Sequence, residues 1–198
     1  MVLDAPQPDT EGNGRRERDR AIGIYIGVLA VVLAICSMGG GNASKEATLK
    51  TIDAANTWAF FQAKNLRRHV LRTEIDELEL WLAKEPDMPA AGRQAVEARM
   101  KAYRAQVETL TTDPKSGEGL DELWARGKAL ESSRDMALAR DPYFDYGEGF
   151  LQIAIVLASV ALISSGSLLL WVSGFLGFAG TLLTVNGFLL LVRVPGLG

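Results

Sequence analysis

The end of the chain most constrains its fold, because residues 149–194 contain no ionisable side chain other than Arg193. Such a run is roughly twice the ~20 apolar residues that one membrane-spanning helix needs, so it predicts two spans folded back on each other. The small polar segment 164–167 suits a turn at the level of the lipid headgroups, and segment 171–174 is the alternative. Everything before this hairpin must therefore be placed relative to a bilayer.

A third span is predicted near the N-terminus, where residues 21–38 form an uncharged apolar run. This run is longer than the core of about 7–15 residues found in signal peptides, which favours an uncleaved anchor over a cleaved signal sequence. Four arginines precede it: Arg15, Arg16, Arg18 and Arg20. Residues 1–20 as a whole are predicted to form a disordered basic tail, because the polar start of the chain shows no apolar period.

Small residues occupy one face of this first span. They alternate in steps of four and three, at Gly23, Gly27, Ala30, Ala34, Ser37 and Gly41. Such a face lets helix backbones approach closely, and Gly23 with Gly27 forms the Gly-x-x-x-Gly pattern of helix dimers. Packing on the C-terminal hairpin and self-association are equally weighted interpretations. Gly177, between Gly174 and Gly180, gives the last span a similar thin region.

The polar middle of the chain predicts three helices, over residues 44–85, 90–111 and 118–140. Proline- and glycine-containing segments separate them, and Asp141 with Pro142 is expected to end the third. In the first of these helices Leu71, Ile75, Leu78 and Leu82 repeat at heptad spacing. Gly39, Gly40 and Gly41 predict a hinge between the N-terminal span and this long helix.

These elements predict an all-α integral membrane protein with three transmembrane helices and an extramembrane antiparallel helical or coiled-coil domain. The expected parts are the tail 1–20, the first span 21–41, the helical domain 42–146, the transmembrane hairpin 147–194 and the C-terminal tail 195–198.

No constellation of catalytic or metal-binding residues is visible. The chain has one histidine, His69, and one cysteine, Cys36, whereas a zinc site needs three or four protein ligands. Neither a phosphate-binding loop nor a dinucleotide fingerprint is present. The net charge of -3, with both signs mixed, excludes a basic field for nucleic acid. We therefore expect no enzyme activity, no metal, no cofactor and no nucleic-acid partner.

Three further residues are candidates for interaction. Trp58 and Phe61 lie three apart and share a helix face, either as an aromatic plug between helices or as a docking face for a partner. Asn186 is the most polar residue of the last span, and an interhelical hydrogen bond is its expected role.

Two segments carry a family resemblance. Residues 54–64, Ala-Ala-Asn-Thr-Trp-Ala-Phe-Phe-Gln-Ala-Lys, and residues 151–159, Leu-Gln-Ile-Ala-Ile-Val-Leu-Ala-Ser, are the motifs that carry it, together with Asn42 and Ala43. The chain resembles the bacterial membrane-protein family of unknown function numbered four-three-three-seven over about residues 21–192. The resemblance implies an inner-membrane protein with one N-terminal and two C-terminal spans, and no assigned activity.

The expected function is a non-catalytic role in assembly or protein interaction through the helical domain. An oligomeric pore or transport-accessory subunit is the alternative. The expected partners are the lipid bilayer and either further copies of the chain or a membrane-protein complex. The arginines before the first span place the N-terminus in the cytoplasm, so the helical domain of this multi-pass protein is predicted to be periplasmic. Basic residues at the other flanks count the opposite way, but the first span usually dominates.

Overall fold

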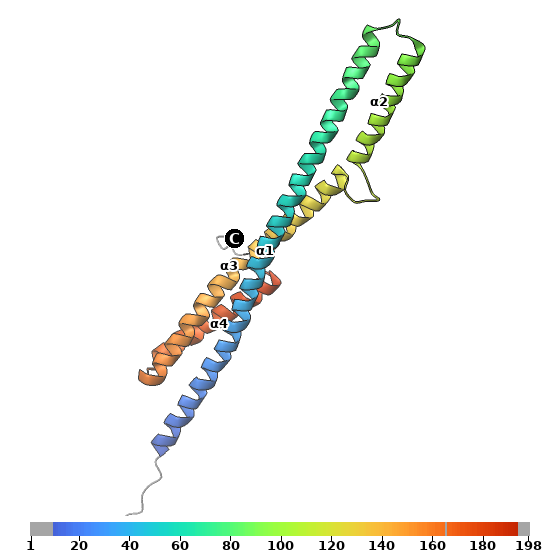
Figure 1. Cartoon of the computed structure of the whole chain (residues 1–198). Coiled ribbons are helices and arrows are strands. Elements are labelled where there is room, and N and C mark those ends of the chain that lie inside the picture. Colours follow the sequence, from blue (N-terminus) through green and yellow to red (C-terminus); the bar gives the residue numbers. More distant parts are fainter. Residues whose placement is uncertain (1–9, 165, 194–198) are drawn as a thin grey trace, which may run out of the picture. The chain divides into compact units, whose positions relative to one another are not determined.

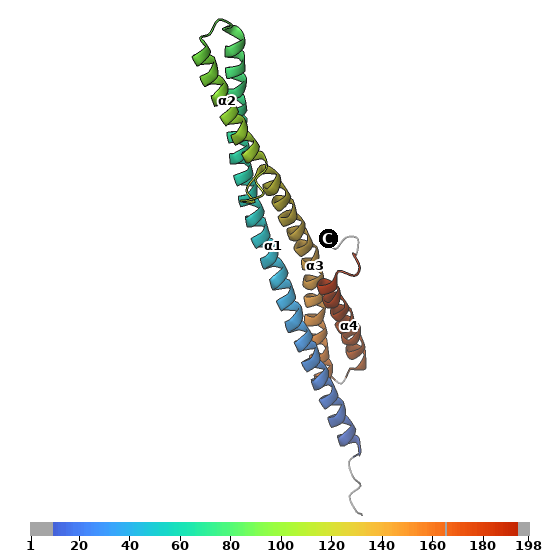
Figure 2. The same cartoon turned by 90° about the vertical axis from the view of Figure 1, so that its right-hand side faces the viewer.

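The computed structural model describes residues 10–164 and 166–193, with side chains from residue 14 onward. The described residues form four α-helices and no strand (Figures 1 and 2). The helices are α1 (Thr10–Lys84), α2 (Ala90–Thr111), α3 (Leu120–Ser164) and α4 (Ser167–Leu189). The predicted all-α class is confirmed.

The chain divides into two compact units, which we describe separately. The apolar unit comprises Met1–Glu46 and Met136–Gly198, and the polar unit comprises Ala47–Asp135. Within the described residues, three helices contain a stretch long and apolar enough to cross a membrane, namely α1, α3 and α4. This composition is compatible with the predicted multi-pass membrane protein.

In the apolar unit α4 lies beside α3 and the N-terminal part of α1 in both views (Figures 1 and 2). The predicted turn at 164–167 is confirmed, since α3 ends at Ser164 and α4 begins at Ser167. Gly166 occupies the N-cap position of α4. The alternative turn at 171–174 is wrong, because that segment is helical.

The predicted hinge at the triple glycine is wrong, because α1 continues through it without a break. Gly39 and Gly40 instead form a seat for the buried ring of Phe144. A Cβ atom on Gly39 would lie 2.5 Å from the Cε1 atom of Phe144, and one on Gly187 of α4 would lie 2.9 Å from it. Phe188 closes the seat, its ring centroid 4.9 Å from that of Phe144 in an edge-to-face arrangement. These glycines serve close packing rather than bending.

Two other helix boundaries differ from expectation. Helix α1 already begins at Thr10, so disorder is the wrong prediction for residues 10–20, whereas residues 1–9 lie outside the described part. Helix α3 runs through Pro142, although proline removes one backbone hydrogen bond. The residues after it, Tyr143 and Phe144, are 3% and 2% exposed, so their packing holds the helix together across the proline.

The polar unit contains the antiparallel pair of α2 and the C-terminal part of α1, which lie side by side in both views (Figures 1 and 2). Helix α2 has the predicted bounds. Ile75 of α1 and Val96 and Met100 of α2 form the buried core of this pair, and Leu78 and Leu82 pack against it. Heptad spacing thus correctly identified the face of α1 that α2 covers.

The seat of Phe144 yields predictions of opposite sign for two glycines that lie two residues apart, Gly39 and Gly41. Gly39→Ala should lower the free energy of unfolding by about 1–3 kcal/mol, because its methyl group overpacks the aromatic ring. Gly41→Ala should raise it by up to about 1 kcal/mol, because among the described residues nothing lies within 4 Å of the new methyl group and alanine favours the helix. Thermal unfolding in mild detergent, followed by circular dichroism, measures both. Equal shifts for the two variants would contradict the seat.

Candidate interaction surfaces

A chain of hydrogen bonds joins the three apolar helices. The Tyr25 hydroxyl of α1 donates to the backbone oxygen of Ser173 in α4 at 2.9 Å. The Ser173 hydroxyl in turn donates to the backbone oxygen of Ala154 in α3 at 2.7 Å. Ser173 is fully buried, so an unmade hydrogen bond there would be costly in an apolar medium. No sequence motif predicts this role for Tyr25 or Ser173, because each is a single polar residue within an apolar run.

Gly177, a predicted interaction residue, packs within the chain. A Cβ atom at this position would lie 2.8 Å from the Tyr25 hydroxyl and 2.9 Å from Cδ2 of Leu29. Gly180 allows a similar approach to α3, where its Cβ would lie 2.8 Å from Cγ of Leu151. The thin region of the last span therefore brings α4 against both neighbouring helices.

Helices α3 and α4 do not cover the small-residue face of the first span. Gly23, Gly27, Ala30 and Ala34 are all exposed. Among the residues with described positions, none lies within 4 Å of a Cβ atom built on Gly23 or Gly27. The covered face of α1 instead carries larger side chains at Ile22, Leu29 and Cys36. One of the two interpretations, that this face packs on the chain's own C-terminal hairpin, is therefore wrong.

Trp58 and Phe61 belong to an aromatic cluster in the polar unit. The ring centroids of Trp58 and Trp124 lie 5.1 Å apart, and those of Trp58 and Phe61 lie 5.7 Å apart, both edge-to-face. Gly127 of α3 permits this contact, since a Cβ there would lie 2.7 Å from Cζ2 of Trp58. The two residues thus lie between α1 and α3, the position expected of an aromatic plug.

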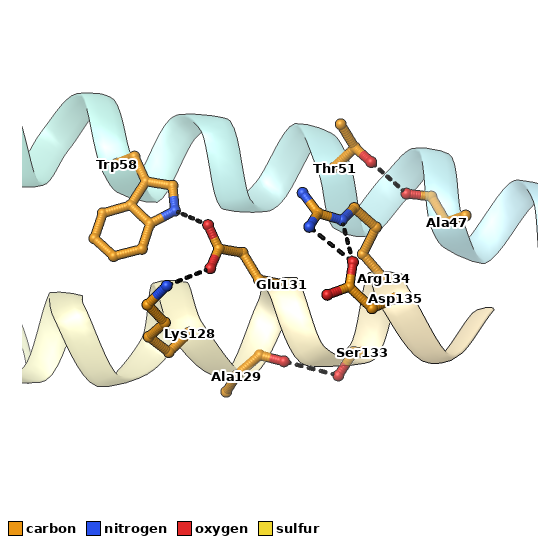
Figure 3. Close-up of polar contacts among 9 residues, drawn as sticks. All are labelled: Ala47, Thr51, Trp58, Lys128, Ala129, Glu131, Ser133, Arg134 and Asp135. Atoms are coloured by element: carbon orange, nitrogen blue, oxygen red, sulfur yellow. Dashed lines mark hydrogen bonds and ion pairs between the residues drawn. The ribbon is translucent and has the colours of Figure 1, made fainter. Parts of the chain in front are cut away.

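A polar network borders this cluster, as Figure 3 shows. The Trp58 indole N–H donates to Glu131 at 3.0 Å, and the Lys128 ammonium donates to the other oxygen of Glu131 at 2.9 Å. The hydrogen bond from Lys128, and then that from Trp58, hold the pKa of Glu131 below its ordinary value. Lys128 also lies over the rings of Trp58 and Trp124. Glu131 of α3 therefore links α3 to Trp58 of α1, and we call Trp58, Lys128 and Glu131 the charged clasp.

Asn186 forms no interhelical hydrogen bond through its side-chain amide, so that prediction is wrong for the described residues. Its side-chain nitrogen donates to the backbone oxygen of Val192 at 2.8 Å, and its side-chain oxygen accepts from the backbone N–H of Val192 at 3.0 Å. Leu190 is left-handed, with φ of 46°, and its N–H donates to the Asn186 carbonyl. Leu190 is therefore the C-cap of α4, and the Asn186 side chain holds the chain beyond it, so that α4 ends at Leu189 instead of near residue 192.

A second apolar face of α1, not predicted from the sequence, is exposed in the polar unit. Residues in alternating steps of three and four form this heptad seam: Leu49, Ile52, Asn56, Ala59, Ala63, Leu66 and Val70. The four large apolar members, Leu49, Ile52, Leu66 and Val70, are each at least half exposed. The buried positions Ala54, Thr57 and Ile75 lie on a different face. Assigning every apolar residue of this helix to a heptad position would have identified the seam from the sequence.

The structure offers no group of three or more potential metal ligands within the part of the chain that it describes. His69 is exposed on α1.

Comparison with known protein families gives a match over most of the chain. The model of the family described as "Domain of unknown function (DUF4337)" matches residues 18–190. No curated protein and no solved structure matches the chain.

The charged clasp predicts a pH dependence. A carboxylate with a lowered pKa stabilises the folded state above its ordinary pKa of 4.5, and this contribution is lost as the pH falls through the folded-state value. Between about pH 6 and pH 3, the wild type should therefore lose more stability than Glu131→Gln, which has no charge to lose. Chemical unfolding followed by tryptophan fluorescence measures this. Glu97→Gln, an exposed carboxylate on α2, is the control and should follow the wild type. Parallel curves for wild type and Glu131→Gln would contradict the clasp.

Proposed function

The chain belongs to the DUF4337 family, and from that premise we propose that it is a non-catalytic assembly protein of the bacterial inner membrane, which pairs with a second copy of itself through the heptad seam. The exposed seam on α1 is the observation that carries this proposal. Apolar side chains at heptad spacing, left uncovered by their own chain in a polar setting, are typical of a helix that pairs with another helix.

The residue types of the heptad seam favour a parallel pair. In heptad notation Leu49, Asn56, Ala63 and Val70 take the a position. Ile52, Ala59 and Leu66 take the d position. An asparagine at one a position fixes register and favours two strands, at a cost in stability. Asn56 therefore supports an in-register parallel dimer over an indiscriminate hydrophobic contact.

The flanking charges are consistent with the same arrangement. In a parallel pair, residues at g contact residues at the following e position of the other helix. Gln62 would then lie opposite Arg67 of the second copy, and His69 opposite its Glu74. Neither pair brings like charges together.

Anchoring in a bilayer strengthens such an interaction. The seam covers only residues 49–70 and includes two alanines, so two free helices of this kind would associate weakly. Copies held in one membrane with the same orientation meet at a raised effective concentration, which converts weak contact into stable association. Their common orientation also favours the parallel arrangement over the antiparallel one.

A second candidate function is an oligomeric pore or a transport-accessory subunit. The exposed small-residue face at Gly23, Gly27, Ala30 and Ala34 favours it, because this face allows first spans of several copies to pack closely. No acidic or basic residue lies in the middle of the apolar runs, so we do not propose a proton-coupled pathway.

Cysteine cross-linking tests the pairing and separates the two functions. In a Cys36→Ala background, Leu66→Cys should form a disulfide-linked dimer in membranes, because d positions of a parallel pair face each other. Arg72→Cys, exposed on α1 outside the seam, is the control and should remain monomeric. Equal cross-linking of both variants would refute the seam. A dimer from Leu66→Cys but a ladder of higher oligomers from general amine cross-linking would favour the pore.

Topology has a separate test. With the N-terminus in the cytoplasm, the helical domain 42–146 faces the periplasm, the 164–167 turn faces the cytoplasm, and the chain ends outside. Glu118→Cys in the Cys36→Ala background should therefore react with a membrane-impermeant maleimide in intact spheroplasts. Ser164→Cys, in the turn, should react only after lysis. The reverse pattern would invert the assignment and place the helical domain among cytoplasmic partners.

A further inference from the structure

A groove of about 400 Å³ lies between the first span and the start of α4, entirely within the apolar unit. Arg18 is one of its lining residues. The rest of its lining is apolar or aromatic, from Ala21, Ile22 and Tyr25 on α1 and from Leu170, Trp171 and Gly174 on α4. The lining of the groove is thus apolar except for the cationic side chain of Arg18.

The position of the groove matches the boundary between headgroups and acyl chains. Arg18 is among the arginines that precede the apolar run of α1, and Trp171 lies one turn into α4, directly after the predicted membrane-surface turn. Trp171 is 80% exposed, and tryptophan is enriched at membrane interfaces because its ring is apolar and its N–H is polar. A molecule in this groove would have one end in each environment.

The polar group in the wall is already satisfied. Tyr25 lines the groove, and its hydroxyl is hydrogen-bonded to Ser173 in the contact between α1 and α4. The lining of the groove therefore combines apolar and aromatic side chains with one arginine, Arg18. Guanidinium groups bind phosphate with several hydrogen bonds, and basic pockets between spans bind anionic lipid headgroups.

We propose that this groove binds one phospholipid with an anionic headgroup. The lipid phosphate pairs with Arg18, and an acyl chain lies along Ile22, Leu170 and Gly174. A second copy of the chain is a poorer occupant, because a symmetric contact here would bring two Arg18 side chains together with their neighbouring arginines. The proposal is independent of the pairing of α1 helices, since none of the groove residues belongs to the heptad seam.

Native mass spectrometry of the full chain in mild detergent tests the site. The protein is titrated with dioleoylphosphatidylglycerol and, separately, with the zwitterionic dioleoylphosphatidylcholine. The wild type should bind one phosphatidylglycerol in preference to phosphatidylcholine. Arg18→Gln should weaken phosphatidylglycerol binding by about tenfold, the effect of losing one charge-assisted interaction, and should leave phosphatidylcholine binding unchanged. Arg20→Gln, in the same arginine cluster but outside the groove, is the matched control.

A second variant tests the apolar part. Gly174→Leu should fill the groove and block binding of both lipids without disturbing the fold, because among described residues nothing lies within 4 Å of a Cβ there. Gly149→Leu is equally unobstructed on α3, lies outside the groove, and should bind as the wild type does. Equal weakening by Arg18→Gln and Arg20→Gln would indicate diffuse attraction and overturn the proposal. It would also fail if Gly174→Leu left lipid binding intact, or changed the oligomeric state instead.

Discussion

Close contact between a phenylalanine ring and bare helix backbone is the interaction on which the apolar unit depends. Between apolar helices in lipid the hydrophobic effect provides no net attraction, so packing and hydrogen bonds must hold the helices together. Phe144 meets this requirement by filling the space that Gly39, Gly40 and Gly187 leave open. The seat joins α3 to α1 and α4 at one point, and the hydrogen bonds through Tyr25 and Ser173 join the same three helices at another. Neither contact requires a charged group.

Exposed apolar surface has a different meaning in each unit. In the apolar unit, exposed side chains such as Val28, Phe175 and Leu182 are suited to contact with acyl chains, where their exposure costs nothing. In the polar unit, the exposed Leu49, Ile52 and Leu66 would face water and lose the free energy that their burial would release. This difference leads us to look for a protein partner on the heptad seam and a lipid partner in the groove.

Much of the fold follows from the sequence, because long uncharged stretches predict membrane spans and helix-breaking residues predict where helices end. The three apolar stretches, the 164–167 turn and helix α2 were predictable from uncharged length and from helix-breaking residues. The errors have a common cause, which is that tertiary packing overrides local preference. Triple glycine and Pro142 both disfavour a helix, yet packing around Phe144 and Tyr143 keeps α1 and α3 continuous. The role of Asn186 was not predicted because it depends on the left-handed conformation of Leu190, which no sequence pattern indicates. The groove near Arg18 could not have been predicted, since it depends on which residues of α1 and α4 come together.

The edge-to-face contact of Trp58 and Trp124 also has an optical consequence. Indole rings held 5.1 Å apart at an interplanar angle of 76° are close enough for their electronic transitions to couple, and the fixed angle makes the coupled pair chiral. Such a pair contributes its own bands to the circular dichroism spectrum, beyond those of the helical backbone. Because one ring comes from α1 and the other from α3, the signal exists only while these two helices remain in contact. The polar unit therefore carries a built-in spectroscopic reporter of its own integrity, which needs no label.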